Sequence, residues 1–273
     1  MSGRSLYGWL IAVLIGCCSL PLPAWAQIVE PDNSHSINPS PSAQAVPDSS
    51  VDLKQTAQQI LSLTNRFRAQ HGRGELTNNT ELSRAAQDFA DYLARTDTFS
   101  HTADGKRPSQ RVGEHGYHSC IVAENIAEEY NSAGFTTASL ARSLVTGWRH
   151  SPEHRKNLLD GDLEELGVGV ARSQRTGRYY AVQDFGRPKE KAVVFRISNE
   201  ADAPIHYTVD GQTLTLDPHY TATLTRCRPP ELDFQNARGK SEDAKEEEEA
   251  FHPKSGAHYV IRGSGGNYTV EAE

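Results

Sequence analysis

Residues 151–159 (SPEHRKNLL) constrain the fold of this chain more than any other segment. Ser151 can cap a helix, Pro152 fits the first helical turn, and Glu153 lies near the positive end of the helix dipole. The segment therefore predicts a short helix with His154 in its first turn.

Three further motifs accompany this helix in a fixed order: FSH at residues 99–101, AENIA at 123–127 and YYAVQDFG at 179–186. In that order and at those separations, the four motifs resemble the CAP superfamily in its bacterial form. This superfamily unites cysteine-rich secretory, antigen 5 and plant pathogenesis-related proteins, and its module is also called the SCP-like extracellular domain. The resemblance covers roughly residues 53–186 and implies an α-β-α sandwich, so we expect a CAP domain at residues 51–188.

Hydrophobic periodicity independently indicates a mixed α+β domain. Apolar side chains at helical spacing predict helices over residues 53–70, over 82–93 and from about 136 to 148. Two runs rich in apolar, β-branched and aromatic residues, 166–171 and 179–185, predict a pair of antiparallel strands. Helices interspersed with strands agree with the sandwich that the resemblance implies.

The resemblance ends before the last part of the chain, where apolar and polar residues alternate with a period of two. Residues 205–216 are centred on Asp210-Gly211, which predicts a two-residue β-hairpin because both turn positions tolerate positive φ angles. Further alternating runs follow, so we expect residues 191–273 to form a small all-β, sandwich-like domain. The acidic run near residues 239–249 is interpreted as a solvated loop, with an acidic recognition segment as the alternative.

The N-terminal region carries the features of an export signal. Residues 1–26 contain one basic residue, an apolar run, two prolines and a terminal Ala-Trp-Ala, a pattern that predicts a secreted or periplasmic protein. The alternative is a lipoprotein anchored through Cys17, because Leu-Ile-Gly-Cys resembles a bacterial lipoprotein box. Residues 27–50 are rich in Pro, Ser and Asn and predict a disordered linker.

The net charge of the chain argues against one class of partner. The chain has 28 basic and 35 acidic side chains, which give a formal charge of −7. Such a surface argues against non-specific binding to nucleic acid. A small ligand, a lipid, the cell wall and a protein all remain open as partners.

The resemblance also implies a functional cleft, because two histidines and two acids line a surface cleft in CAP proteins. It carries this role onto His101 in the FSH motif and Glu124 in the AENIA motif. The bacterial form of residues 151–159 supplies the second histidine as His154, and Glu153 is the candidate for the second acid. The alternative role of Glu153 is to stabilise the helix N-terminus electrostatically.

The motifs depart from the eukaryotic pattern at two positions. Ser151 stands where eukaryotic members have an acid, and Tyr179 stands where they have a histidine. Outside the context of the motifs, His101 and Glu124 would be interpreted as polar residues that hold a loop or bond to the backbone. The cleft assignment therefore depends on the motifs being read together.

Three functions are compatible with this cleft. The first is an exported binding module that holds a divalent metal ion, Zn²⁺ or another, or a small ligand. The second is a metal-assisted, peptidase-like hydrolase, in which His101 and His154 hold the metal and one position stays open for water. The third is a structural or interaction protein whose β domain does the binding. We rank binding ahead of catalysis and assign no catalytic residue.

Two cysteines lie beyond the predicted export signal, Cys120 in the CAP segment and Cys227 in the β domain. An exported protein meets an oxidising environment, so these residues can form one disulfide that joins the two domains. The alternative is a pair of separately buried thiols.

Overall fold

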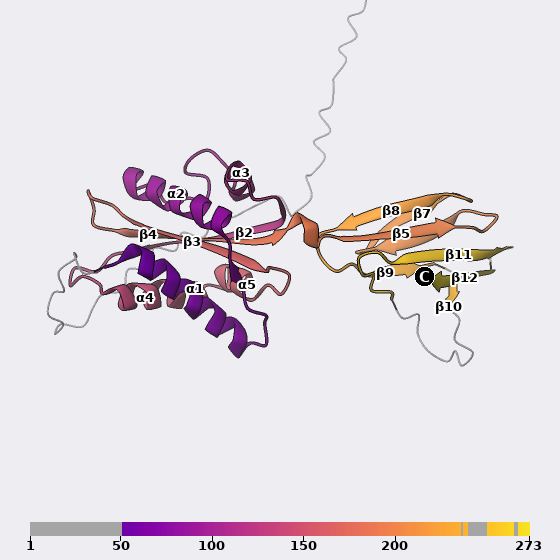
Figure 1. The fold of residues 1–273 in the computed structure, drawn as a ribbon, viewed down its shortest axis with the longest axis horizontal. Coiled ribbons are helices and arrows are strands. Elements are labelled where there is room, and N and C mark those ends of the chain that lie inside the picture. The colour runs from indigo at the N-terminus through magenta and orange to yellow at the C-terminus, as the bar shows by residue number, and fades with distance from the viewer. Residues whose placement is uncertain (1–50, 236, 240–249, 265–266) are drawn as a thin grey trace, which may run out of the picture. The chain divides into compact units, whose positions relative to one another are not determined.

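The computed structural model describes most of the chain after residue 50 (Figure 1). The described residues are 51–235, 237–239, 250–264 and 267–273. The predicted export signal, the lipidation site at Cys17, the linker at 27–50 and nearly all of the acidic run at 239–249 lie outside these residues. Within the described part of the chain, no helix has the length and apolarity needed to cross a membrane.

The first domain is an α-β-α sandwich, which confirms the expected fold. Its four-stranded sheet has the order β1-β3-β4-β2, and Figure 1 shows α2 and α3 on one face and α1, α4 and α5 on the other. The elements are α1 (Leu53–Gln70), β1 (Thr77–Asn78), α2 (Thr80–Thr96), α3 (Pro108–Glu114), β2 (Ser119–Glu129), α4 (Thr137–His150), α5 (Pro152–Leu159), β3 (Glu165–Arg172) and β4 (Tyr179–Pro188).

Helix α2 lies unusually close to β3. A Cβ atom added to Gly167 would lie 2.1 Å from the carbonyl carbon of Leu82, and one added to Gly169 would lie 2.3 Å from that of Ala86. Only glycine permits this approach without a shift of backbone. The two glycines therefore fix α2 over β3, close to one edge of the sheet.

The opposite face of the sheet carries the larger core. Trp148 of α4 and Phe185 of β4 are buried there, as expected for core residues. Trp148 also donates its indole N–H to the carbonyl of Ile126 at 3.1 Å, so α4 is tied to β2. Buried indoles usually find such a partner.

Helix α5 begins at Pro152, as the sequence predicts, but it lacks the expected side-chain cap. Ser151 occupies the N-cap position, and its side chain makes no capping hydrogen bond. Instead, Asn157 and Asn125 connect α5 to β2 through side-chain hydrogen bonds. Tertiary contacts therefore hold this eight-residue helix where a local cap would otherwise be needed.

The second domain is all-β. A five-stranded sheet has the order β10-β12-β11-β5-β8, and a three-stranded sheet has the order β7-β6-β9. The strands are β5 (Val193–Asn199), β6 (Ile205–Val209), β7 (Gln212–Leu216), β8 (Thr221–Arg226), β9 (Leu232–Phe234), β10 (Ala237–Gly239), β11 (His258–Ser264) and β12 (Asn267–Ala272). Side chains from both sheets, including Phe195, Tyr207, Phe234 and Tyr259, share one core, which makes the domain sandwich-like.

The predicted hairpin joins β6 and β7. Asp210 has φ 51° and Gly211 has φ 78°, so both turn residues take the positive φ values expected for a two-residue loop. Ahead of this domain, β4 runs to Pro188, and a short 3₁₀ turn (Lys189–Lys191) leads to β5. The connection between β4 and β5 therefore consists of residues 189–192.

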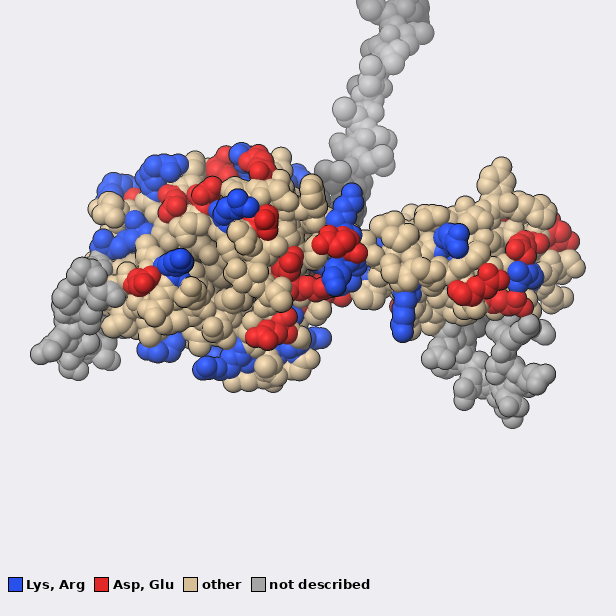
Figure 2. All heavy atoms as spheres, viewed as in Figure 1, with Lys and Arg blue, Asp and Glu red and all other residues tan. Residues whose placement is uncertain are grey.

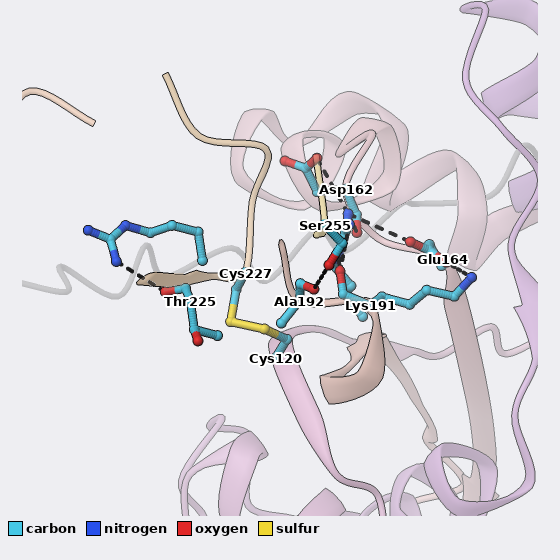
Figure 3. The surroundings of a disulfide bond; sticks show 10 residues. Cys120, Asp162, Glu164, Lys191, Ala192, Thr225, Cys227 and Ser255 are labelled. Carbon is cyan, nitrogen blue, oxygen red and sulfur yellow. Dashed lines mark hydrogen bonds and ion pairs between the residues drawn. A yellow bond between two sulfur atoms is a disulfide. The ribbon is translucent and has the colours of Figure 1, made fainter. Parts of the chain in front are cut away.

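A disulfide joins Cys120 on β2 to Cys227, which directly follows β8 (Figure 3). The two Cα atoms lie 5.3 Å apart, within the usual range for a disulfide. Close by, Arg228 donates to the Asp160 carboxylate at 2.7 Å and pairs with Asp162. One covalent bond and one arginine thus connect residues of the two domains.

Candidate functional site

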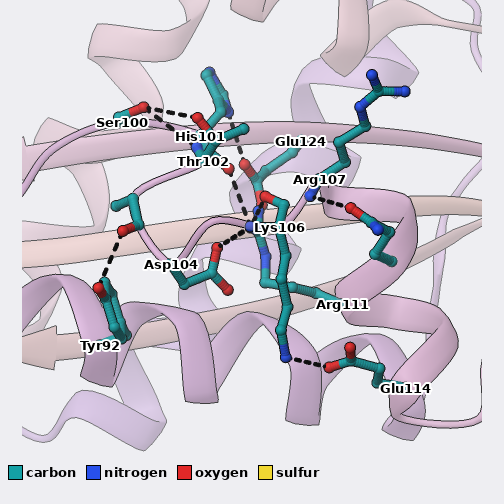
Figure 4. Close-up of polar contacts among 12 residues, drawn as sticks. Tyr92, Ser100, His101, Thr102, Asp104, Lys106, Arg107, Arg111, Glu114 and Glu124 are labelled. Carbon is teal, nitrogen blue, oxygen red and sulfur yellow. Dashed lines mark hydrogen bonds and ion pairs between the residues drawn. The ribbon is translucent and has the colours of Figure 1, made fainter.

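The site is built around a contact between His101 and Glu124 (Figure 4). His101 lies in the turn that follows α2, and Glu124 lies on β2 with its side chain 1% exposed. Nδ1 of His101 is 2.7 Å from Oε1 of Glu124. A carboxylate only accepts, so Nδ1 carries the proton. Nε2 is then the remaining ring nitrogen, on a side chain that is 41% exposed, and it has no hydrogen-bond partner among the described residues.

Arg111 of α3 holds both ends of this contact. It pairs through Nη2 with the second carboxylate oxygen of Glu124. Its Nη1 donates to the carbonyl of His101 at 3.0 Å, to the Asp104 carboxylate at 3.0 Å and to the carbonyl of Lys106 at 2.9 Å. Arg111 is only 4% exposed, so these bonds form away from water and are stronger than surface ones. The arginine therefore fixes the loop that carries His101 against β2.

A second carboxyl group lies behind Glu124. Asp184 of β4 is its direct cross-strand partner, and it is fully buried. Within the described part of the chain, neither carboxyl oxygen of Asp184 has a hydrogen-bond donor. Burial raises the pKa of Asp184 well above its usual range, and the negative charge of Glu124 raises it further.

One buried arginine cannot neutralise two buried carboxylates. Since Arg111 pairs directly with Glu124, Asp184 is the group that keeps its proton. A protonated Asp184 can donate to Glu124, which gives the two carboxyl groups a hydrogen bond that two carboxylates cannot form. Glu124 therefore lies between Asp184 of β4 on one side and His101 on the other.

The second predicted histidine faces the same region. His154 lies in the first turn of α5 and is half-buried. Burial lowers the pKa of His154 below its usual range, and the nearby charge of His101 lowers it further, while Glu153 acts in the opposite direction. The effect of His101 on His154 indicates that the two imidazoles lie near each other.

Side-chain amides hold α5 in position. Asn125 donates to the carbonyl of His154 at 3.3 Å and to Gln183 at 3.1 Å. Asn157 donates to the carbonyl of Glu124 at 3.2 Å and to Asn125 at 2.9 Å. Asn125 and Gln183 are fully buried, so each bond is costly to break. The network fixes the His154 backbone relative to β2.

Glu153 takes a different position from the other candidates. Its side chain is exposed in the first turn of α5, and it has no hydrogen bond to His101, Glu124 or His154 among the described residues. Its connection to the site is the electrostatic effect on His154. Of the four predicted residues, His101 and Glu124 are in direct contact, whereas His154 interacts electrostatically with His101 and Glu153.

The sequence analysis missed Arg111 and Asp184. Asp184 had a usable signal, because it is the one charged residue in YYAVQDFG, and a charge inside a buried strand usually has a functional or paired role. Arg111 had none. It sits in a short helix whose sequence, PSQRVGE, gives no indication that the arginine turns inward.

The donor set limits what metal chemistry the cleft can support. Among the residues that the structure describes, no three or more His, Cys, Asp or Glu side chains are arranged to hold a metal ion. Glu124 is already engaged by His101 and Arg111.

Fold and site together define the first domain as an α-β-α sandwich with a cluster of histidine and carboxyl groups. Residues 61–185 match the family model for CAP, the cysteine-rich secretory protein family. This segment therefore carries a CAP domain, and the β domain lies outside it.

Parts of the chain are similar to known proteins and solved structures. The chain is 32% identical over 122 residues to the membrane protein YlbC of Bacillus subtilis, a match that covers 44% of this chain and 33% of that protein. It therefore spans about a third of that relative. An outer surface protein from Borrelia burgdorferi has 22% identity and a TM-score of 0.45, with 51% of this chain and 97% of that chain covered. An extracellular SCP-domain protein from Bacillus anthracis has 27% identity and a TM-score of 0.42, with 54% and 45% covered.

Proposed function

We propose that this chain is an exported binding module whose CAP cleft takes up a divalent metal ion, Zn²⁺ or a similar one, through His101 and His154. The observation that carries the proposal is the 2.7 Å contact between His101 Nδ1 and Glu124 Oε1. Histidines that bind metals commonly donate their other ring N–H to a carboxylate, which fixes the tautomer and the orientation of the ring. His101 is oriented in this way, with Nε2 on the exposed side.

The properties of His154 support the same proposal. A metal ion binds the neutral form of imidazole, and the lowered pKa of His154 keeps that ring neutral near pH 7. Imidazole nitrogens suit Zn²⁺ and several other divalent transition metals. The remaining coordination positions would be filled by water or by a ligand from a partner.

Two imidazoles support binding better than hydrolysis. Catalytic zinc sites have three protein ligands and one open position for water. This cleft has two candidate ligands, and its carboxylate is engaged by Arg111. A metal held by two imidazoles is weakly bound and exchangeable, which suits a site that a small ligand or a protein partner completes.

Isothermal titration with Zn²⁺ tests the proposal. The wild-type protein should bind one ion, and both His101→Ala and His154→Ala should weaken binding by more than about tenfold, because each removes one of two ligands. His150→Ala is a matched control, since His150 is an exposed histidine at the end of α4 that bonds only to its own helix. Equal affinities for wild type and both cleft variants would overturn the proposal.

Export is proposed from the sequence of residues 1–26. The mass of the mature N-terminus distinguishes the two forms. Cleavage after Ala26 gives an unmodified chain starting at Gln27, whereas lipidation leaves a modified Cys17 at the N-terminus.

A further inference from the structure

A groove of about 880 Å³ runs along the outer edge of β3, away from the histidine cleft. Its apolar floor includes Leu53 and Ala57 from α1 and Val168 and Val170 from β3, and α2 forms its other wall. None of His101, Glu124, Asp184 or His154 lines it. The groove is therefore a second feature of the domain, and the proposed metal site leaves it unused.

The edge of β3 in this groove lacks a neighbouring strand over most of its length. In the described part of the chain, β1 pairs with β3 only at Glu165 and Leu166. Beyond that point α2 crosses over the sheet instead of continuing alongside it. An open edge of this kind is a template for an added strand.

One side chain already occupies the place of a strand residue. Gln87 of α2 accepts from the Val170 N–H at 3.2 Å and donates to the Val170 carbonyl at 3.1 Å. These are the two bonds that a residue on a neighbouring strand would make. In an antiparallel pair the outward-facing residues alternate, so the backbone of Val168 also points into the groove. The N–H and carbonyl of Val168 have no partner among the described residues.

The charges around the groove indicate what it can accept. Five basic side chains and two acidic ones line it; the basic residues are Lys54, Arg84, Arg95, Arg172 and Arg175. This positive excess stands out on a chain whose formal charge is −7. The side chains of Arg84 and Arg175 are 60% and 72% exposed. They pair with Glu81 and Asp97, so a peptide carboxylate would join or replace these partners. On the face in Figure 2, Lys and Arg side chains lie over α2, with acidic ones between them.

We propose that this groove binds an extended, acidic peptide segment of a partner protein, which adds to the sheet as a strand outside β3. The peptide backbone would bond to Val168, its apolar side chains would contact the floor, and its carboxylates would pair with Arg84 and Arg175. Main-chain bonds supply affinity in such strand addition, and the alternating side chains supply specificity. This site is independent of the metal cleft.

Fluorescence anisotropy with a short labelled peptide of alternating Val and Glu tests the proposal. The full chain should bind this peptide and should not bind one of alternating Val and Lys. Combined Arg84→Glu and Arg175→Glu substitutions should weaken binding by at least about tenfold, because they reverse the charge of the rim. Arg66→Glu is the matched control, since Arg66 is exposed on α1 and does not line the groove.

Two further measurements separate strand addition from simple charge attraction. Methylation of alternate peptide nitrogens should abolish binding, and hydrogen exchange at the Val168 amide should slow when the unmodified peptide binds. Binding that survives methylation, survives charge reversal, or leaves Val168 exchange unchanged overturns the proposal.

Two other occupants give distinct results, and either one overturns the proposal of a partner. A second copy of the chain would give a dimer in light scattering that dissociates with Arg84→Glu and Arg175→Glu. The chain's own residues 27–50, which contain acidic but no Lys or Arg residues, would block the peptide. In that case the peptide would bind only to a variant in which the acidic residues of segment 27–50 are replaced by neutral ones.

Discussion

Removing the carboxyl groups of both Glu124 and Asp184, which are buried near Arg111, should destabilise the CAP domain more than the two single substitutions together predict. In Glu124→Gln, Arg111 loses its direct partner, but Asp184 also loses the negative charge that helps to keep it protonated. Asp184 then ionises and compensates the arginine. In Asp184→Asn, the Glu124 and Arg111 pair stays intact, and the asparagine amide can donate to Glu124.

Because these groups are buried, the loss of each one should change the free energy of unfolding by a predictable amount. Glu124→Gln should cost about 2 kcal/mol of unfolding free energy, the value for losing a hydrogen bond to a charged group. Asp184→Asn should cost less than about 1 kcal/mol, because the replacement preserves a donor. The double variant leaves Arg111 with Asp104 as its remaining carboxylate and should cost about 4 to 5 kcal/mol, as for a broken buried ion pair. The coupling energy is then at least about 1 to 2 kcal/mol.

Urea denaturation near neutral pH measures all three values. In protein that starts at residue 27, Trp148 is the only tryptophan, and its burial in the core makes its fluorescence a probe of the CAP domain. Glu128→Gln is the matched control on the same strand. Glu128 pairs with Arg178 at 3.1 Å with side chains 22% and 44% exposed, so its loss should cost less than about 1 kcal/mol. If the cost of the double variant equals the sum of the two single costs, Asp184 does not compensate Arg111 when Glu124 is removed. That result would refute this account of the Asp184 proton.

Three further predictions concern stability. Because the pKa of Asp184 is raised on folding, the folded state holds a proton that the unfolded state releases above about pH 4, so wild type should lose stability relative to Asp184→Asn as pH rises from that value. Urea unfolding at acidic and neutral pH checks this, and a constant difference would contradict it. Cys120→Ser or Cys227→Ser opens a loop of 107 residues and should cost up to about 4.7 kcal/mol, measured against the oxidised protein, whereas no loss would show that the bridge does not form in solution. Gly169→Ala forces α2 away from β3 and should lower stability by about 1 to 3 kcal/mol in thermal unfolding, and an unchanged midpoint would show that α2 can yield at no cost.

Local patterns predicted the elements that carry long-range periodicity. Helix α1 coincides with the expected residues 53–70, because its apolar face repeats over five turns. The Asp210-Gly211 turn was equally clear, since a two-residue hairpin demands positive φ at both positions. Helix α3, in contrast, is seven residues long and too short for periodicity to reveal.

In the candidate site, too, some residues could be predicted from local motifs and others depend on tertiary contacts. Motifs pointed to His101, Glu124 and His154, because a shared fold brings these separated residues to one cleft. The roles of Arg111 and Asp184 depend on which groups face each other across α3, β2 and β4, and this pairing is tertiary information. Asp184 is recognisable in the sequence as an acid within a buried strand. The sequence does not reveal that Arg111 lies next to the buried carboxyl groups.

Long-range ¹H–¹⁵N spectra of the histidine rings, recorded with and without Zn²⁺, test the central claim most directly. The account predicts that His101 Nδ1 carries the proton in both spectra, since Glu124 accepts from it. Addition of Zn²⁺ should shift His101 Nε2 and one ring nitrogen of His154 together, at the same metal concentration, while the other histidines stay unchanged. Metal-induced shifts at other histidines, or at only one of these two, would contradict a shared metal site in the cleft.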